Sequence, residues 1–152
     1  MTEKEKWKFI LGFIKRHKIC VLSTVSPDNR PESAVIEFGE TDNLELIFDT
    51  FMTYRKYKNI LNNHNVSVVI GWDEDRTVQY EGVAVELNML DTLKYQKLHV
   101  AKNPSVAKFM VMPGIRCFEI TPKWIRYTDV GVFPYKIIEL DLNFDILTFS
   151  RM

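Results

Sequence analysis

The sequence predicts an α+β protein in which a largely antiparallel sheet curls into a barrel with flanking helices. Three observations predict this class. Runs rich in β-forming residues are joined mainly by short turns, as hairpins are. Apolar residues recur at helical spacing in only a few segments. One long strand changes its alternation at a glycine, as strands do where a sheet bends into a barrel.

A doubly wound fold does not fit this chain. Strands and helices do not alternate regularly along the sequence, and no G-x-G-x-x-G motif occurs.

The first predicted element is an amphipathic helix near the N-terminus. Trp7, Ile10, Leu11 and Ile14 fall on one helical face, with lysines and glutamates around them. We expect this helix to cover its own domain, and docking onto a membrane surface is the alternative.

A hairpin follows the helix. Residues 19–25 are rich in β-forming side chains, and Ser26-Pro27-Asp28-Asn29 is a turn sequence because proline presets the backbone at its second position. Residues 32–38 then alternate, with Ala34, Ile36 and Phe38 on one face. We expect a third strand at 44–48.

The rest of the chain continues as a mixture of strands and helices. We expect a helix at 54–62, strands at 66–72 and 77–87, a mainly helical stretch at 91–109 broken near Pro104, and final strands at 116–121, 124–128 and 137–142.

The long strand at 77–87 changes its parity. Val78 and Tyr80 alternate on even positions, whereas Val83, Val85 and Leu87 alternate on odd ones, and Gly82 lies at the switch. We expect a bulge there that keeps both halves facing the core.

Length and charge limit the classes of function. The 152 residues suit one domain, 1–152. Twenty basic and 20 acidic residues give a net charge of zero, which argues against a general nucleic-acid binder. The N-terminus does not have the pattern of a signal peptide, and no segment has the length needed to span a bilayer. We therefore expect a cytoplasmic protein with neither a nucleic-acid nor a membrane partner.

The cysteines and histidines do not form a recognisable site. Cys20 and Cys117 lie in apolar, strand-like runs, so we expect buried free thiols. His17, His64 and His99 have no metal-ligand spacing, and no G-x-S-x-G is present.

The start of the helix at 54–62 is the most informative segment. Arg55 and Lys56 follow Tyr54 in the first turn, where cations oppose the helix dipole. A phosphate would compensate them, because it could accept hydrogen bonds from free backbone N–H groups, from Thr50 or Thr53, and from both cations. The alternative is that these cations form only a solvated helix face.

Three segments resemble the pyridoxamine 5′-phosphate oxidase superfamily. The order of Thr50, Arg55 and Lys56, before a helix and an apolar strand, is similar to the family segment T-N-Y-x-S-R-K. Residues 72–87, WDEDRTVQYEGVAVEL, resemble the family pattern of W followed by R-x-V-x-V-E-G-x-A-x-x-L. Residues 118–129, FEITPKWIRYTD, resemble a late strand with P-x-x-I-x-F.

The resemblance covers roughly residues 5–130, and it implies a split β-barrel that forms a homodimer and binds flavin mononucleotide (FMN) between its subunits. Arg55 and Lys56 would hold the phosphate, and Thr50 would contact the phosphate or the flavin edge. The remaining expected contacts are the strand Ala34, Val35, Ile36 and Glu37 along the isoalloxazine ring, and Thr77 and Gln79 from the partner subunit.

Some positions depart from the family. Glu32 and Glu37 approximately match an arginine and a lysine of the oxidase, and a carboxylate beside phosphate is electrostatically unfavourable. Thr128 stands where the family has a tryptophan, and the substrate motif R-L-H-D-R is absent. We therefore do not expect oxidation of pyridoxamine phosphate.

Three functions stay open on these grounds. The first is an FMN-dependent oxidoreductase that acts on an unidentified small molecule, with no residue assigned as catalytic. The second is a non-catalytic protein that binds or carries flavin, deazaflavin F420 or haem. The third is a dimeric module that has lost its cofactor.

Overall fold

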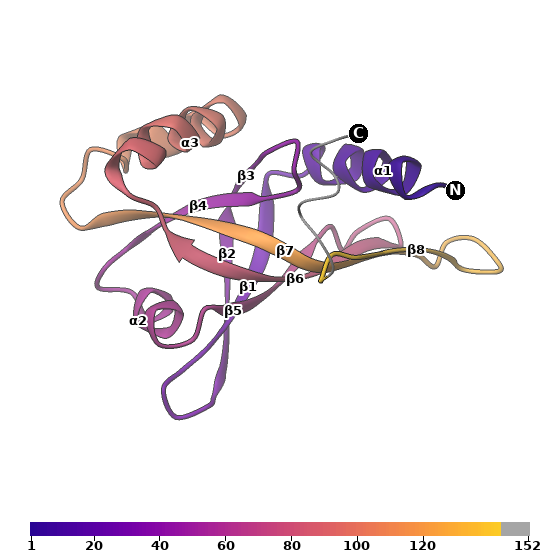
Figure 1. Ribbon diagram of the computed structural model, residues 1–152, viewed down its shortest axis with the longest axis horizontal. Helices are drawn as coiled ribbons and strands as arrows, with labels where there is room; N and C mark the ends of the chain where they lie inside the picture. Colours follow the sequence, from indigo (N-terminus) through magenta and orange to yellow (C-terminus); the bar gives the residue numbers. More distant parts are fainter. Residues whose placement is uncertain (144–152) are drawn as a thin grey trace.

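The computed structural model describes residues 1–143, and its chain trace is shown in Figure 1. The helices are α1 (Glu3–Lys15), α2 (Arg55–Asn62), α3 (Met89–Lys102) and the short 3₁₀ helix η1 (Pro104–Lys108). The strands are β1 (Ile19–Val25), β2 (Pro31–Glu37), β3 (Gly39–Glu40), β4 (Leu46–Phe51), β5 (Asn65–Ile70), β6 (Arg76–Glu86), β7 (Ile115–Asp129) and β8 (Lys136–Asp141).

All strand pairs in the described sheet are antiparallel, as the sequence predicts. The order is β2-β1-β5-β6-β7-β4-β3, and β8 pairs with β7. β7 is long enough to pair with β4 along its first half and with β8 along its second half, while β6 runs along its other edge. The two strands expected at 116–121 and 124–128 are therefore one strand, and the sheet curls and divides around it.

The bulge lies on β7, so the prediction for β6 is wrong. β6 keeps Val78, Tyr80 and Ala84 buried on even positions, whereas Val85 is 51% exposed. The register instead shifts because Glu81 pairs with Trp124 and Gly82 pairs with Pro122, which leaves Lys123 as the extra residue. The buried face of β7 accordingly changes from even to odd positions.

Gly82 is still required at this corner. A Cβ atom there would lie 2.5 Å from the carbonyl oxygen of Thr121, closer than real contacts allow. The glycine lets the two backbones approach where β7 bends, and the extra residue appears on the partner strand.

The core lies inside the curled sheet, and α1 covers one end of it. Ile10, Phe13 and Ile14 of α1 are buried, so the helix covers its own domain as expected. The hydroxyl of Tyr80, at the centre of the core, lies 3.0 Å from the carbonyl oxygen of Leu44 and 2.9 Å from that of Ile120.

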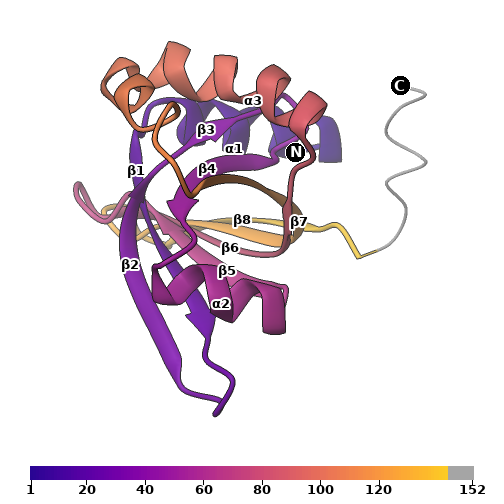
Figure 2. The same cartoon turned by 90° about the vertical axis from the view of Figure 1, so that its left-hand side faces the viewer.

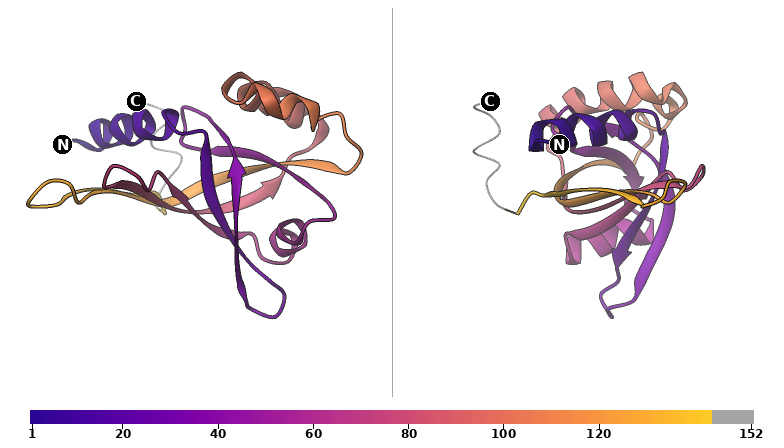
Figure 3. Two further views of the ribbon diagram at one scale, coloured as in Figure 1. Left: turned by 180° about the vertical axis from the view of Figure 1, so that it is seen from behind. Right: turned by 90° about the vertical axis from the view of Figure 1, so that its right-hand side faces the viewer.

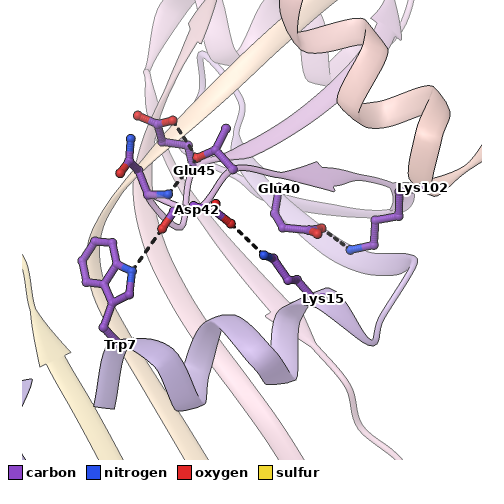
Figure 4. Close-up of polar contacts among 8 residues, drawn as sticks. Trp7, Lys15, Glu40, Asp42, Glu45 and Lys102 are labelled. Atoms are coloured by element: carbon purple, nitrogen blue, oxygen red, sulfur yellow. Dashed lines mark hydrogen bonds and ion pairs between the residues drawn. The ribbon is translucent and has the colours of Figure 1, made fainter. Parts of the chain in front are cut away.

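Two further contacts fix α1 against the β3–β4 turn, as Figure 4 shows. The indole of Trp7 donates a hydrogen bond to the carbonyl oxygen of Asp42 at 3.1 Å. The ammonium of Lys15 lies 2.7 Å from a carboxylate oxygen of the same aspartate. Lys102 of α3 pairs with Glu40 of β3 nearby, so both helices are tied to one edge of the sheet.

The helices divide between the two sides of the sheet. α1 and α3 lie on one side, and α2 lies on the other, next to the β1–β2 hairpin (Figure 2). The view from behind shows the same division (Figure 3). This arrangement places the start of α2 opposite the hairpin, and Arg55 and Lys56 line the groove between them.

Candidate functional site

The start of α2 has no side-chain cap. Tyr54 precedes the helix with an extended backbone, its side chain makes no capping hydrogen bond, and the first turn contains no acidic residue. The positive end of the helix dipole and two cations, Arg55 and Lys56, therefore lie together. This local sequence favours an external anion, since helix N-termini bind anions through their free N–H groups.

An open groove lies between this helix start and the β1–β2 hairpin. Its volume is about 370 Å³, at the lower end of the range for small-molecule sites. One wall is the inner face of the hairpin and the other is the loop and first turn of α2. The lining residues are Leu22, Thr24, Glu32, Ser33, Ala34, Thr53, Tyr54, Arg55 and Lys56.

Glu32 pairs with Arg55 inside the groove. The guanidinium of Arg55 donates to one carboxylate oxygen of Glu32. The other oxygen accepts a hydrogen bond of 2.8 Å from the amide of Asn59, which also donates to the hydroxyl of Thr24 at 3.0 Å. Asn59 is buried in α2, so it holds the Glu32 carboxylate against the helix.

Lys56 lines the same groove and is half-buried. Burial lowers the pKa of its ammonium below the usual lysine value, because the charged form loses water. The ammonium lies 4.8 Å from the centre of the Tyr54 ring, a cation–π distance. An anion in the groove would restore the favourable surroundings that this charge lacks.

The four β2 residues predicted to line a flavin point alternately to the two faces of the sheet. Ala34 lines the groove, and Ile36 packs against the core from the same face. Val35 and Glu37 lie on the opposite face, and Val35 is 63% exposed. Strand alternation explains this division, since successive side chains point to opposite faces of a sheet.

Thr50 does not line the groove. It is buried on β4, and its hydroxyl has no hydrogen-bond partner among the described residues. Threonine chemistry in the groove comes instead from Thr53 and Thr24.

Thr77 and Gln79 lie on the outward face of β6, away from the groove residues of the same subunit. Gln79 pairs in register with Val69 of β5, which pairs with Val21 of β1, which pairs with Val35 of β2. These side chains form one row across the outward face of the sheet, and the predicted role of Thr77 and Gln79 would require a second subunit.

Thr24, which lines the groove, and Asn59, which lies behind Glu32, follow from the fold more than from the sequence. Asn59 and Thr24 are joined by a hydrogen bond across 35 residues. The alternation of β2 does place Glu32 on the face of Ala34, which was a usable signal. Its direct pairing with Arg55 depends on how α2 packs against β1.

A buried pair lies apart from the groove, under α3. The His99 ring nitrogen Nδ1 is 2.9 Å from a carboxylate oxygen of Asp49, and both side chains are nearly inaccessible. Cys117 lies beside Asp49, and burial raises the pKa of its thiol. Burial raises the pKa of the Cys20 thiol to about 12, so both cysteines are buried free thiols as expected.

A second cavity of about 570 Å³ lies between α1, the β3–β4 turn and α3. Two of its lysines, Lys15 and Lys102, are already paired with the carboxylates of Asp42 and Glu40 (Figure 4). No group of three or more His, Cys, Asp or Glu side chains with metal-binding geometry occurs within residues 1–143. Over the same range, no helix combines the length and apolar character needed to cross a membrane.

The curled sheet that divides around β7 is a split barrel, and its groove presents cations suited to an anionic ligand. A family model described as pyridoxamine 5′-phosphate oxidase matches residues 7–129. The chain belongs to this family.

Two curated relatives match only about half of this chain. The pyridoxine/pyridoxamine 5′-phosphate oxidase of Shewanella pealeana is 31% identical over 75 residues, which are 49% of this chain and 35% of that protein. The match thus spans about a third of the curated relative.

Solved structures resemble nearly the whole chain. General Stress Protein 26 of Bacillus anthracis is 30% identical, with a TM-score of 0.67, covering 92% of this chain and all (100%) of that one. A pyridoxamine 5′-phosphate oxidase-related, FMN-binding protein of Nostoc punctiforme is 16% identical, with a TM-score of 0.67 and coverage of 86% and 87%. A haem-binding protein of Mycobacterium smegmatis is 12% identical, with a TM-score of 0.76 and coverage of 94% and 59%. The last two show the shared fold.

Proposed function

We propose that this protein is a flavoprotein that binds FMN in the groove between α2 and the β1–β2 hairpin. One observation carries the proposal: Arg55 and Lys56 both line this groove at an uncapped helix start. Arg55 presents a planar fork that can hold two phosphate oxygens, and Lys56 adds a point charge from a half-buried position.

The groove residues fit a phosphate ester better than a haem. Haem iron needs an axial ligand such as histidine, cysteine, methionine or tyrosine. Among the described groove residues Tyr54 alone belongs to this set, and its ring lies against Lys56. Haem is the second candidate, because the haem-binding protein of M. smegmatis shares the barrel fold. The deazaflavin F420 is a third candidate cofactor.

The rest of the flavin requires a second subunit in this proposal. The groove is open and has a volume of about 370 Å³. Its hairpin side provides one wall for a planar ring. The outward row of exposed Val35, half-buried Val21 and Val69, and exposed Gln79 offers a mixed apolar and polar surface for a second copy of the chain. A homodimer would bring Thr77 and Gln79 of the partner toward the flavin.

FMN would supply the redox chemistry when bound, and the protein would bind and orient it. Ala34 would lie against the ring, while Thr53 and Thr24 would donate or accept hydrogen bonds along the polar tail. Glu32 in the groove is paired with Arg55, and we assign no lining residue as a catalytic acid or base. An FMN-dependent oxidoreductase is the leading activity, and a flavin carrier is the second.

Titration of purified protein with FMN tests the binding. We expect quenching of FMN fluorescence that saturates at one FMN per chain, and no saturable quenching would contradict the proposal. A steady-state assay with NAD(P)H and oxygen then separates the two activities, because turnover supports the oxidoreductase and tight binding without turnover supports the carrier.

A further inference from the structure

Glu32 occupies the position in which a ligand's anionic group would meet Arg55. Its carboxylate accepts from the guanidinium inside the groove, as a phosphate oxygen would. The Glu32 side chain is only 18% exposed, whereas Arg55 is 79% exposed. The carboxylate is therefore the fixed member of the pair, and the arginine is the member that can turn to another anion.

Asn59 prevents the carboxylate from leaving. Its amide donates to Glu32 at 2.8 Å and to Thr24 at 3.0 Å, and Asn59 itself is buried. If Arg55 turned toward a ligand, Glu32 would stay in the groove, held by Asn59 alone. A negative charge would then remain beside the incoming phosphate.

We propose that Glu32 is an intramolecular competitor that weakens phosphate binding and so makes the bound cofactor exchangeable. This inference rests on the proposed function and concerns the selectivity of the same groove. Glu32 cancels one of the two cationic charges that Arg55 and Lys56 provide. The groove then attracts a phosphate dianion less strongly than two uncompensated cations would, because like charges repel strongly in a partly buried site.

The Glu32→Gln variant tests this directly. Glutamine keeps a carbonyl oxygen that can accept from Asn59, so the fold should persist, and a thermal melt checks it. We expect FMN to bind about tenfold tighter than to the unaltered protein, since one neighbouring charge at an effective dielectric constant of about 20 has at least this effect. Riboflavin, which lacks the phosphate, should change less than twofold.

Glu3→Gln is the matched control. Glu3 lies in the exposed first turn of α1, and α1 lies on the other side of the sheet from α2 (Figure 2), so this variant removes the same charge away from the groove. Its affinity for FMN should equal that of the unaltered protein. Equal gains in both variants would assign the effect to net charge and overturn the inference.

The outcomes separate the inference from the function beneath it. Tighter FMN binding by Glu32→Gln, with riboflavin unchanged, supports the competitor. Unchanged or weaker FMN binding by this variant overturns the competitor and leaves FMN binding intact. If neither the variant nor the unaltered protein binds any flavin, the proposed function fails, and the inference fails with it.

Discussion

Two carboxyl groups in this molecule have pKa values that are shifted in opposite directions. Glu119 on β7 is half-buried near Glu45. Burial is the larger cause that raises the pKa of its carboxyl, and repulsion from the Glu45 carboxylate is the second. Glu139 on β8 is exposed and accepts hydrogen bonds from Trp124 and Arg126, which lower its pKa. Their contributions to stability should therefore respond to pH in opposite directions.

Replacement of Glu119 by glutamine should stabilise the fold at neutral pH. Because the folded-state pKa is raised, the contribution of Glu119 is fully present below its unfolded value of about 4.5 and is lost as the pH rises through the raised pKa. We expect Glu119→Gln to increase the unfolding free energy by roughly half a kcal/mol at pH 7, discounted for solvent screening, and to give no increase at pH 4. Urea denaturation at both pH values measures this.

The same substitution at Glu139 serves as its control. Glu139→Gln should lower stability at pH 7, because the stabilisation from a lowered pKa is present above the unfolded value and is lost on acidification. A gain of stability at pH 7 in both variants would contradict the assigned environments.

Among the elements, β6 and β7 show where reasoning from sequence succeeds and where it stops. The change of alternation around Gly82 indicates a corner, and the corner exists. The sequence of β6 alone cannot say which strand carries the extra residue, because that depends on the pairing with β7. Ala84, a small residue, takes the buried position, and the larger Val85 faces outward.

Gly82→Ala should destabilise this corner. The added Cβ would lie 2.5 Å from the carbonyl oxygen of Thr121 and 2.8 Å from a side-chain carbon of Ile120. We expect a loss of about 1–3 kcal/mol in the unfolding free energy, the usual cost of overpacking. Gly12→Ala in α1 is the comparison, since its Cβ would meet only Arg16 at 3.8 Å, and it should gain about 0.5–1 kcal/mol. Equal effects of the two changes would argue against a close backbone approach at β7.

The features of the site that depend only on neighbouring residues in the sequence could be predicted. Arg55 and Lys56 are adjacent in sequence, and the helix that they open follows from its own periodicity. Glu32 was visible as a departure from the family, but its pairing with Arg55 spans 23 residues and depends on tertiary packing. Strand alternation buries the side chain of Thr50 on β4, outside the groove lining, and its contact with the phosphate or the flavin edge stays a prediction.

For the whole molecule, the outward face of the sheet bears on assembly. Val35 is 63% exposed at the end of the row that contains Val21, Val69 and Gln79. An exposed valine beside two half-buried ones favours association with another surface. The homodimer stays a prediction, and Gln79, which we expect to contact the flavin from the partner subunit, belongs to this row.

Val35→Lys should weaken the proposed dimer. A lysine ammonium placed in an apolar contact loses its water without gaining a partner. We expect the unaltered protein to scatter light as a dimer at micromolar concentration and the variant to scatter as a monomer with weaker FMN binding. If the unaltered protein is a monomer and still binds FMN tightly, FMN binding does not require a second subunit.

Parallel titrations of Arg55→Ala with FMN and riboflavin test whether Arg55 and Lys56 hold the phosphate of a flavin nucleotide. Loss of a charge-assisted hydrogen bond should weaken FMN binding by about tenfold or more and leave riboflavin affinity nearly unchanged. If both ligands lost affinity to the same degree, the groove would not recognise phosphate through Arg55.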